Sequence, residues 1–203
     1  MRLKLYVSLL WASPGGEHDT DFDAYSWAVL FGLSQPSRNG KRRVLAALDW
    51  LEESRFVSKE RRPGKTTVVT VRHEDGSGAA YSKPEPVEGG DPVYRKLAAE
   101  YWVNGWSAVL DGSSLAFWLV LMDETNSGDK KTGVWLSESQ TEAKYSISPY
   151  LRQAALRQLQ AAGLIDAKRI YAREAFAVTS SRTEMKVAGG GLIGDPLQGL
   201  GSG

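Results

Sequence analysis

The chain has 203 residues, which is enough for one large domain or for two small ones that each bury a modest core. It contains no cysteine and only two histidines, so thiolate metal sites and cysteine nucleophiles are excluded and imidazole chemistry is poorly supplied. No apolar run approaches the ~20 residues of a membrane span, and the apolar N-terminal run is too short for a signal peptide. We therefore expect a cytoplasmic protein without cofactor, metal or catalytic activity.

The formal net charge of +1 conceals a strong segregation of charge. Positions 38–65 carry nine Lys and Arg residues against four acids, and positions 141–173 carry six against two. The acids collect elsewhere, in segments 17–23 and 74–91. Two separate basic segments are typical of a chain that binds a polyanion.

The first half predicts three helices and a hairpin. Apolar spacing favours helices over 3–12, 25–33 and 37–54, with an acidic loop between the first two. Ser37 is the expected N-cap of the third helix, whose basic first turn opposes the helix dipole and so suggests an external anion. β-Branched residues predict a strand over 66–72 that pairs with 56–57 across a tight turn at 62–65.

The second half predicts a similar series. An aromatic-rich stretch over 94–110 precedes expected helices at 115–123, 138–144 and 149–162, with a short strand at 134–136. A weaker hairpin follows over 166–173 and 175–179. The expected domains are 1–75 and 93–188, joined by a Gly/Pro-rich linker at 76–92 and followed by a glycine-rich flexible tail at 189–203.

A local pattern occurs in both halves. Ala46-Ala47-Leu48 with Phe56-Val57 matches Ala154-Ala155-Leu156 with Leu164-Ile165, at a constant offset of 108 residues. A constant offset indicates an internal repeat of a helix followed by a strand.

The order helix, turn, basic helix, strand and basic hairpin resembles the winged helix-turn-helix, a family of mostly DNA-binding domains. The resemblance covers about positions 3–72 and 113–179 and lies in element order and apolar spacing. It implies a mostly helical α+β fold with two such domains in tandem. The second copy departs from the pattern, because Arg152 occupies the repeat position of apolar Val44.

DNA contact requires long donors at the start of each recognition helix and on each hairpin, where they reach base edges and phosphates. The first half offers Ser37, Arg38, Asn39, Lys41, Arg42 and Arg43 on the helix and Arg61, Arg62 and Lys65 on the hairpin. The second half offers Tyr150, Arg152, Gln153 and Arg157 on the helix and Lys168, Arg169 and Arg173 on the hairpin. The alternative interpretation is that these side chains form solvated helix surfaces.

The sequence thus predicts a nucleoid-associated protein that binds double-stranded DNA sequence-specifically, as a transcription regulator or a replication or partition factor. A homodimer or higher assembly is possible. The alternative is an adaptor that uses its winged helices for protein contacts in a chromosome-associated complex. Two apparent motifs fail: segment 19–30 lacks the glycine and glutamate of a calcium loop, and Gly64-Lys65-Thr66 lacks the first glycine of a phosphate-binding loop.

Overall fold

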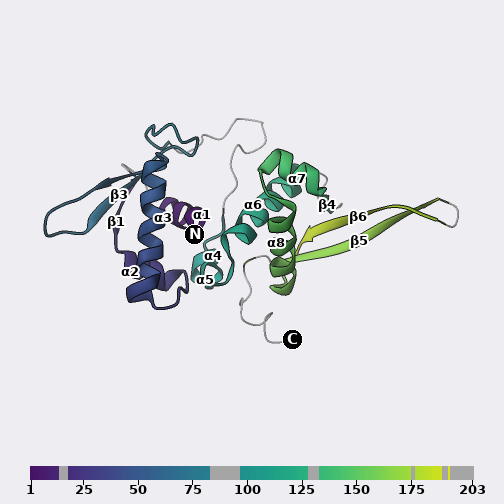
Figure 1. Cartoon of the computed structure of the whole chain (residues 1–203), viewed down its shortest axis with the longest axis horizontal. Helices are drawn as coiled ribbons and strands as arrows, with labels where there is room; N and C mark the ends of the chain where they lie inside the picture. The colour runs from purple at the N-terminus through teal and green to yellow at the C-terminus, as the bar shows by residue number, and fades with distance from the viewer. Residues whose placement is uncertain (14–17, 83–96, 128–132, 175–176, 189–191, 193–203) are drawn as a thin grey trace. The chain divides into compact units, whose positions relative to one another are not determined.

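The computed structural model describes residues 1–13, 18–82, 97–127, 133–174, 177–188 and 192. The chain is a mixed α+β protein with two small three-stranded antiparallel sheets (Figure 1). It divides into two compact units: residues 1–86 with 107–112, and residues 87–106 with 113–203. Among the described helices, none has both the length and the apolar character needed to cross a lipid bilayer.

The first unit places three helical segments against a sheet whose central strand comes last in sequence. In chain order its elements are α1 (Arg2–Ala12), β1 (Asp19–Phe22), α2 (Ala24–Leu30), the π-helical turn η1 (Pro36–Gly40), α3 (Lys41–Glu53), β2 (Val57–Glu60) and β3 (Thr67–Val71). The sheet order is β1-β3-β2, with Asp21 opposite Val68 and Val57 opposite Val71. Both outer strands therefore make their backbone ladder hydrogen bonds with β3.

The core of the first unit follows from the spacing of apolar residues along α3. Val44, Ala47, Leu48 and Leu51 are buried, at the i, i+3, i+4 and i+7 positions that share one helix face. They join a cluster with apolar side chains of α1, α2 and the sheet, among them Leu5, Leu9, Phe31, Val57, Val69 and Val71. The opposite face of α3 is left to solvent.

Two expectations for the first unit are wrong. The acidic stretch expected as a loop contains strand β1, because its residues pair with β3 from Asp19↔Thr70 to Phe22↔Thr67. The described part of the predicted linker also folds back onto the unit: Arg72 bridges to Ala80, and Tyr81 packs against the core and the His18 ring at 4.9 Å. Residues 83–92 of that linker lie outside the described residues.

A short segment from the predicted second domain belongs to the first unit. Residues 107–112 pack with it, and Ser107 Oγ donates a hydrogen bond to the Leu30 carbonyl oxygen at 3.1 Å. Gly32 permits this approach, since a Cβ there would lie 2.8 Å from the Ala108 Cβ and its φ of +60° favours glycine. Residues of the aromatic-rich stretch 94–110 therefore belong to both units.

The second unit also has a three-stranded antiparallel sheet, in which two strands are longer and one is shorter than those of the first. Its elements are α4 (Glu100–Val103), α5 (Trp106–Val109) at the boundary, α6 (Gly112–Ser127), β4 (Val134–Trp135), α7 (Glu138–Tyr145), α8 (Pro149–Ala161), β5 (Ile165–Glu174) and β6 (Ala177–Val187). The sheet order is β4-β6-β5. The β5–β6 hairpin is longer than the predicted segments 166–173 and 175–179, and it extends well beyond the helices of its unit (Figure 1).

The two units share an order of elements. Apart from the turn η1, the first unit from α1 to β3 and the second from α6 to β6 both run helix, strand, helix, helix, strand, strand, and in both the third strand is central. The bounds of α3 and α8 differ by 108 residues at both ends (149 − 41 and 161 − 53). The buried positions of α8, which are Arg152, Ala155, Leu156 and Leu159, match those of α3 at the same offset.

One residue of the predicted tail is part of the second unit. Leu192 is buried, and its carbonyl oxygen accepts hydrogen bonds from Trp106 Nε1 at 2.8 Å and Asn104 Nδ2 at 3.1 Å. The expectation of a flexible tail from residue 189 is therefore wrong at this position. Residues 189–191 and 193–203 lie outside the described residues.

Candidate nucleic-acid interface

The start of α3 is held against α2 by a close backbone approach at Gly40. A Cβ on Gly40 would lie 3.1 Å from the Ala28 Cβ and 3.2 Å from the Leu33 Cβ, which is tighter than ordinary packing. The preceding turn η1 begins after Gln35, whose φ is +50°, and has no side-chain cap. Ser37 lies inside this turn and is exposed, so the prediction that it caps α3 is wrong. The turn presents Arg38 and Asn39 to solvent.

Four exposed cations gather where η1 joins α3, and we call them the α3 cation cluster: Arg38, Lys41, Arg42 and Arg43. The first turn of α3 contains no acid, so these charges oppose the helix dipole. Among the residues that the structure describes, none of the four forms an ion pair. The cluster is therefore a site of uncompensated positive charge.

Other cations of the first unit are compensated within the chain. Lys59 Nζ lies 2.6 Å from Asp49 Oδ1 and 2.7 Å from Glu52 Oε2. These two acids raise the pKa of Lys59 above its ordinary value, outweighing the opposing effect of burial. Arg62 forms a bidentate ion pair with Glu60, in which Nε and Nη2 each donate a hydrogen bond of 2.9 Å to the carboxylate. The α3 cation cluster is distinguished from these pairs by the lack of acids.

The β2–β3 hairpin supplies two further exposed cations. Arg61 and Lys65 lie in its turn. The φ of +69° at position 64 is a left-handed conformation that favours glycine. Neither Arg61 nor Lys65 has an ion-pair partner in the described part of the chain, whereas Arg62 is held by Glu60. The predicted hairpin contacts therefore divide into two uncompensated cations and one paired cation.

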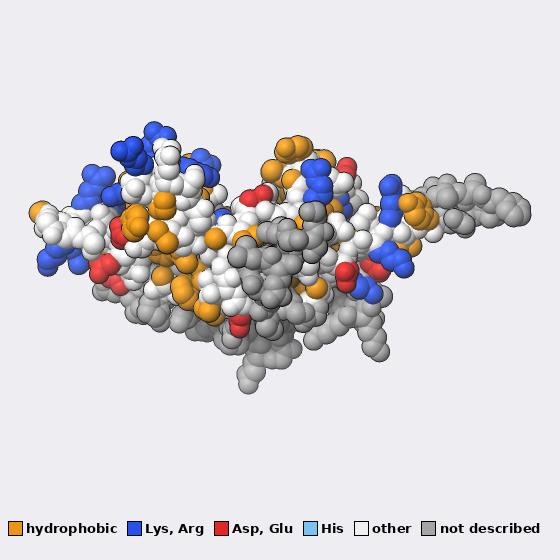
Figure 2. Space-filling view, turned by 90° about the horizontal axis from the view of Figure 1, so that it is seen from below, with side chains coloured by type: hydrophobic (Ala, Val, Ile, Leu, Met, Phe, Trp, Pro, Cys, Tyr) orange, Lys and Arg blue, Asp and Glu red, His pale blue; other side chains and the backbone are white. Residues whose placement is uncertain are grey.

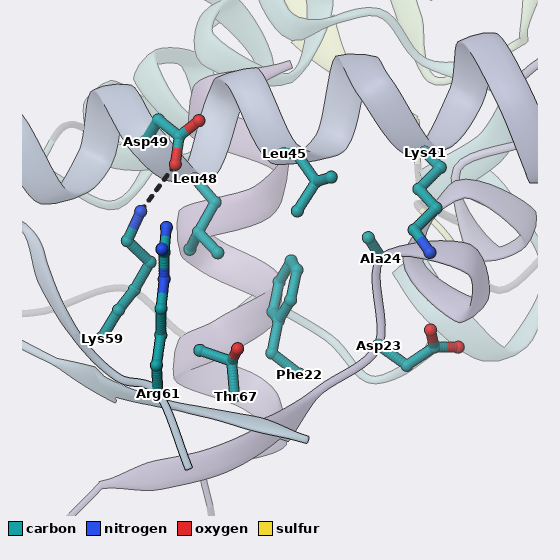
Figure 3. A pocket seen from close by; sticks show the side chains of 10 residues that line it. All are labelled: Phe22, Asp23, Ala24, Lys41, Leu45, Leu48, Asp49, Lys59, Arg61 and Thr67. Carbon is teal, nitrogen blue, oxygen red and sulfur yellow. Dashed lines mark hydrogen bonds and ion pairs between the residues drawn. The ribbon is translucent and has the colours of Figure 1, made fainter. Parts of the chain in front are cut away.

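A small cavity lies between α3 and the hairpin (Figure 3). Its volume is about 180 Å³, with Phe22, Leu45 and Leu48 on its apolar wall and Lys41 and Arg61 at its sides. The two acids that also line it are Asp23 and Asp49.

Both acids already have partners within the chain. The carboxylate of Asp23 caps α2 by accepting hydrogen bonds from Tyr25 N, Ser26 N and Ser26 Oγ, and the bonds from Ser26 lower its pKa. Asp49 pairs with Lys59. Lys41 and Arg61 are left without ion pairs among the described residues, so the groove between helix and hairpin favours an anion.

The corresponding helix of the second unit is positioned by a tighter turn. Ser146, with a φ of +54°, ends α7, and the Ser148 side chain caps α8 by accepting from Leu151 N at 3.4 Å. Pro149 occupies the first helical position. This turn leaves Tyr150, Gln153 and Arg157 exposed, as a recognition helix requires.

Arg152, in contrast, is not on this exposed surface. Its side chain is buried at the repeat position of Val44, and Nη2 donates to the Leu136 carbonyl oxygen at 2.8 Å. The guanidinium lies 5.9 Å from the Phe117 ring centre and 4.0 Å from Glu138 Oε1. Burial lowers its pKa, while the charge of Glu138 acts in the opposite direction. Arg152 is therefore a structural residue, and its prediction as a DNA contact is corrected.

Two basic residues of the β5–β6 hairpin lie opposite acids in the strand register. The register places Lys168 opposite Glu184 and Lys186 opposite Asp166. Arg169 donates two hydrogen bonds to Ser181 Oγ, at 3.2 and 3.1 Å. Lys144, before α8, is bound to Glu124 at 2.6 Å. The side chain of Arg173 lies outside the described part of the structure.

The two units consequently present different surfaces. On the face drawn in Figure 2, Lys and Arg side chains gather over the first unit with a few acids near them, and basic, acidic and apolar side chains are mixed along the described part of the β5–β6 hairpin. Sequence reasoning also missed two exposed leucines, Leu45 on α3 and Leu151 on α8, with exposed fractions of 38% and 42%. Their positions outside the buried stripe of each helix were the signal that could have identified them.

The described residues hold no group of three or more His, Asp or Glu side chains arranged to bind a metal ion. The chain matches no protein-family model, and no curated protein or solved structure is significantly similar to it.

Proposed function

We propose that this chain binds double-stranded DNA sequence-specifically, without catalysis, and that both units are winged helix-turn-helix domains. The order helix, strand, helix, helix, strand, strand with a central third strand supports this assignment. In that fold the second helix of the motif enters the major groove and the hairpin contacts the flanking backbone, and we assign this contact to α3 and the β2–β3 hairpin. The roles that suit this activity are transcription regulation and replication or partition of DNA.

The observation that carries the proposal is the uncompensated charge of the first unit. The α3 cation cluster stands at the start of the helix, and Arg61 and Lys65 extend the positive surface onto the hairpin. Cations in the first turn do not stabilise the fold, because they oppose the helix dipole. A phosphate backbone supplies the missing negative charge, and Arg or Asn at this end of the helix can reach base edges.

Salt-dependent titration of a labelled duplex tests the proposal. Replacement of Arg38, Arg42 and Arg43 by alanine should weaken binding at least 100-fold, since each groove contact is worth about 1 to 3 kcal/mol. The slope of log affinity against log salt should fall by about 2.7, at roughly 0.9 for each phosphate that the protein no longer neutralises.

A matched control removes the same charge from the second unit. The variant with Lys144, Lys168 and Lys186 replaced by alanine should bind within about threefold of the unchanged chain, because Lys144 is paired with Glu124 and the other two lie opposite acids in the hairpin. If both triple variants lost the same DNA affinity, the loss would come from the change in net charge and not from contacts made by the α3 cation cluster. Absence of binding at low salt would refute the proposal, and selection from random duplexes would measure sequence preference.

The adaptor alternative is favoured by one observation in the second unit. The exposed surface of α8 is rich in apolar and amide groups, with exposed fractions of 77% for Tyr150 and 42% for Leu151. Such a helix face suits protein contact.

A further inference from the structure

Four residues of α8 form a row on the side away from its buried face; three of them are exposed and Ala154 is partly buried. Tyr150, Gln153, Ala154 and Arg157 stand at i, i+3, i+4 and i+7, so they share one side of the helix, and we call them the α8 stripe. The buried face of α8 is formed by other residues, from Arg152 to Leu159. Tyr150, one of the most exposed large hydrophobic side chains among the described residues, stands at one end of this row.

The α8 stripe differs in charge from the equivalent positions of α3, which are Arg42, Leu45, Ala46 and Asp49 at the 108-residue offset: α3 has an acid where the stripe has Arg157. The stripe carries a single cation, Arg157, which has no ion-pair partner among the described residues, and it carries no acid. Two copies of the α3 cation cluster would repel each other. Two copies of the α8 stripe would bring together one aromatic ring and one guanidinium from each chain, a favourable cation–π combination.

We propose that the α8 stripe is a self-association surface that binds the same stripe of a second copy of this chain. In a two-fold symmetric contact, if one residue of the first copy contacts a second residue of the partner, the same two residues also meet with the copies exchanged. Tyr150 and Arg157 are seven residues apart, about two helical turns or 10.5 Å. Antiparallel α8 helices that cross between Gln153 and Ala154 therefore place each Tyr150 ring against the partner's Arg157 guanidinium, with small Ala154 allowing close approach.

The test is the mass of the full-length chain in solution without DNA, measured by sedimentation across a concentration series. The unchanged chain should show a monomer–dimer equilibrium. Tyr150→Lys should raise its dissociation constant at least tenfold, because it places an ammonium against Arg157 of the partner subunit. The matched control Tyr171→Lys changes another exposed tyrosine of the same unit, and should leave the equilibrium unchanged.

Reciprocal substitutions make the geometry testable. Arg157→Glu should also weaken the homodimer. An equimolar mixture of the Tyr150→Lys and Arg157→Glu variants should associate more tightly than either alone, because the mixed dimer has one lysine–glutamate pair and one unchanged tyrosine–arginine pair. The chain with both substitutions should also recover association, because its homodimer has two lysine–glutamate pairs. Circular dichroism checks that each variant folds, which is expected because both positions are exposed.

Several outcomes would overturn the inference. These are a chain that remains monomeric at all concentrations, a dimer insensitive to both substitutions, and a mixture no tighter than its components. Loss of DNA sequence preference in Tyr150→Lys without a change in mass would assign the stripe to DNA instead. Because the mass is measured without DNA, this result is independent of the test of DNA binding.

Discussion

The outer faces of α3 and α8 differ far more than their backbones do. Both helices have 13 residues and bury the same four repeat positions, yet the α3 cation cluster gathers at the start of α3, whereas the α8 stripe carries one cation. Both basic segments have an excess of cations, nine against four acids over 38–65 and six against two over 141–173. Among the described residues, no ion pair holds the α3 cation cluster, whereas in the second unit Arg152 is buried, Lys144 is paired with Glu124, and Lys168 and Lys186 lie opposite acids in the strand register. The position and the surroundings of the cations, and not their number alone, distinguish the two surfaces.

The buried cations extend the comparison, because each unit has one among the residues whose side chains the structure describes. Lys4 of α1 lies 5.4 Å from the Phe31 ring centre, and Arg152 of α8 lies 5.9 Å from that of Phe117. Burial lowers the pKa of both groups, and Asp111 and Glu138 respectively act in the opposite direction. A buried cation can therefore be a feature of the fold and not of the binding surface.

The largest expected effect comes from making α3 resemble α8. Val44→Arg should destabilise the protein by about 3 to 5 kcal/mol, because it buries a charge in an apolar cluster without an acceptor. Arg152→Met should cost less than about 1.5 kcal/mol, since a long apolar side chain can replace a buried ion. Urea denaturation measures both. Similar losses of unfolding free energy in the two variants would contradict the view that the Leu136 carbonyl is what allows α8 to bury an arginine at this position.

The pH dependence of stability should reveal Lys4. Burial lowers its pKa from 10.5 to about 8, so between these values the unfolded chain binds a proton that the folded chain has released. Stability therefore carries a constant penalty below pH 8 that is relieved as the pH rises. Lys4→Met should stabilise the chain by up to about 3 kcal/mol at pH 7, with a gain that shrinks above pH 8. A gain independent of pH between 7 and 10 would show that Lys4 is not responsible.

The hairpins should differ in their contribution to DNA affinity. Arg61→Ala with Lys65→Ala should weaken duplex binding about tenfold and lower the salt slope by about 1.8, as expected when two phosphates are no longer neutralised. Lys168→Ala with Arg169→Ala should change little, because Lys168 faces Glu184 and Arg169 is bonded to Ser181. If both double variants lowered DNA affinity and the salt slope equally in a salt titration, the β5–β6 hairpin would also contact DNA.

The smallest effect distinguishes the two helix starts. Ser148→Ala should cost about 0.5 to 1 kcal/mol because it removes the hydrogen bond from Leu151 N to the cap of α8. Ser37→Ala should change stability by only a few tenths of a kcal/mol, since η1 has no side-chain cap. Thermal denaturation of the two variants measures the difference, and a larger loss of stability for Ser37→Ala would reverse the assignment.

The sequence by itself determined the elements whose signal is local. The apolar spacing of Val44, Leu48 and Leu51 predicted α3, and the 108-residue offset predicted that α8 would end in the same way. Helix periodicity requires only neighbours within two turns, so it can be read without tertiary structure. The strand β1 escaped this reasoning because its acidic residues pair with β3, which is distant in the sequence.

Tertiary structure alone decided which cations are available for binding. Compensation of charge acts over a few ångströms, and the acids come from other elements: Lys59 pairs with Asp49 and Glu52 because β2 lies beside α3, and the register of β5 and β6 places Glu184 opposite Lys168. Arg152 is removed from the surface by the position of the Leu136 carbonyl. The number of charges along the chain contains none of these distances, so the contrast between α3 and α8 arises only in the folded protein.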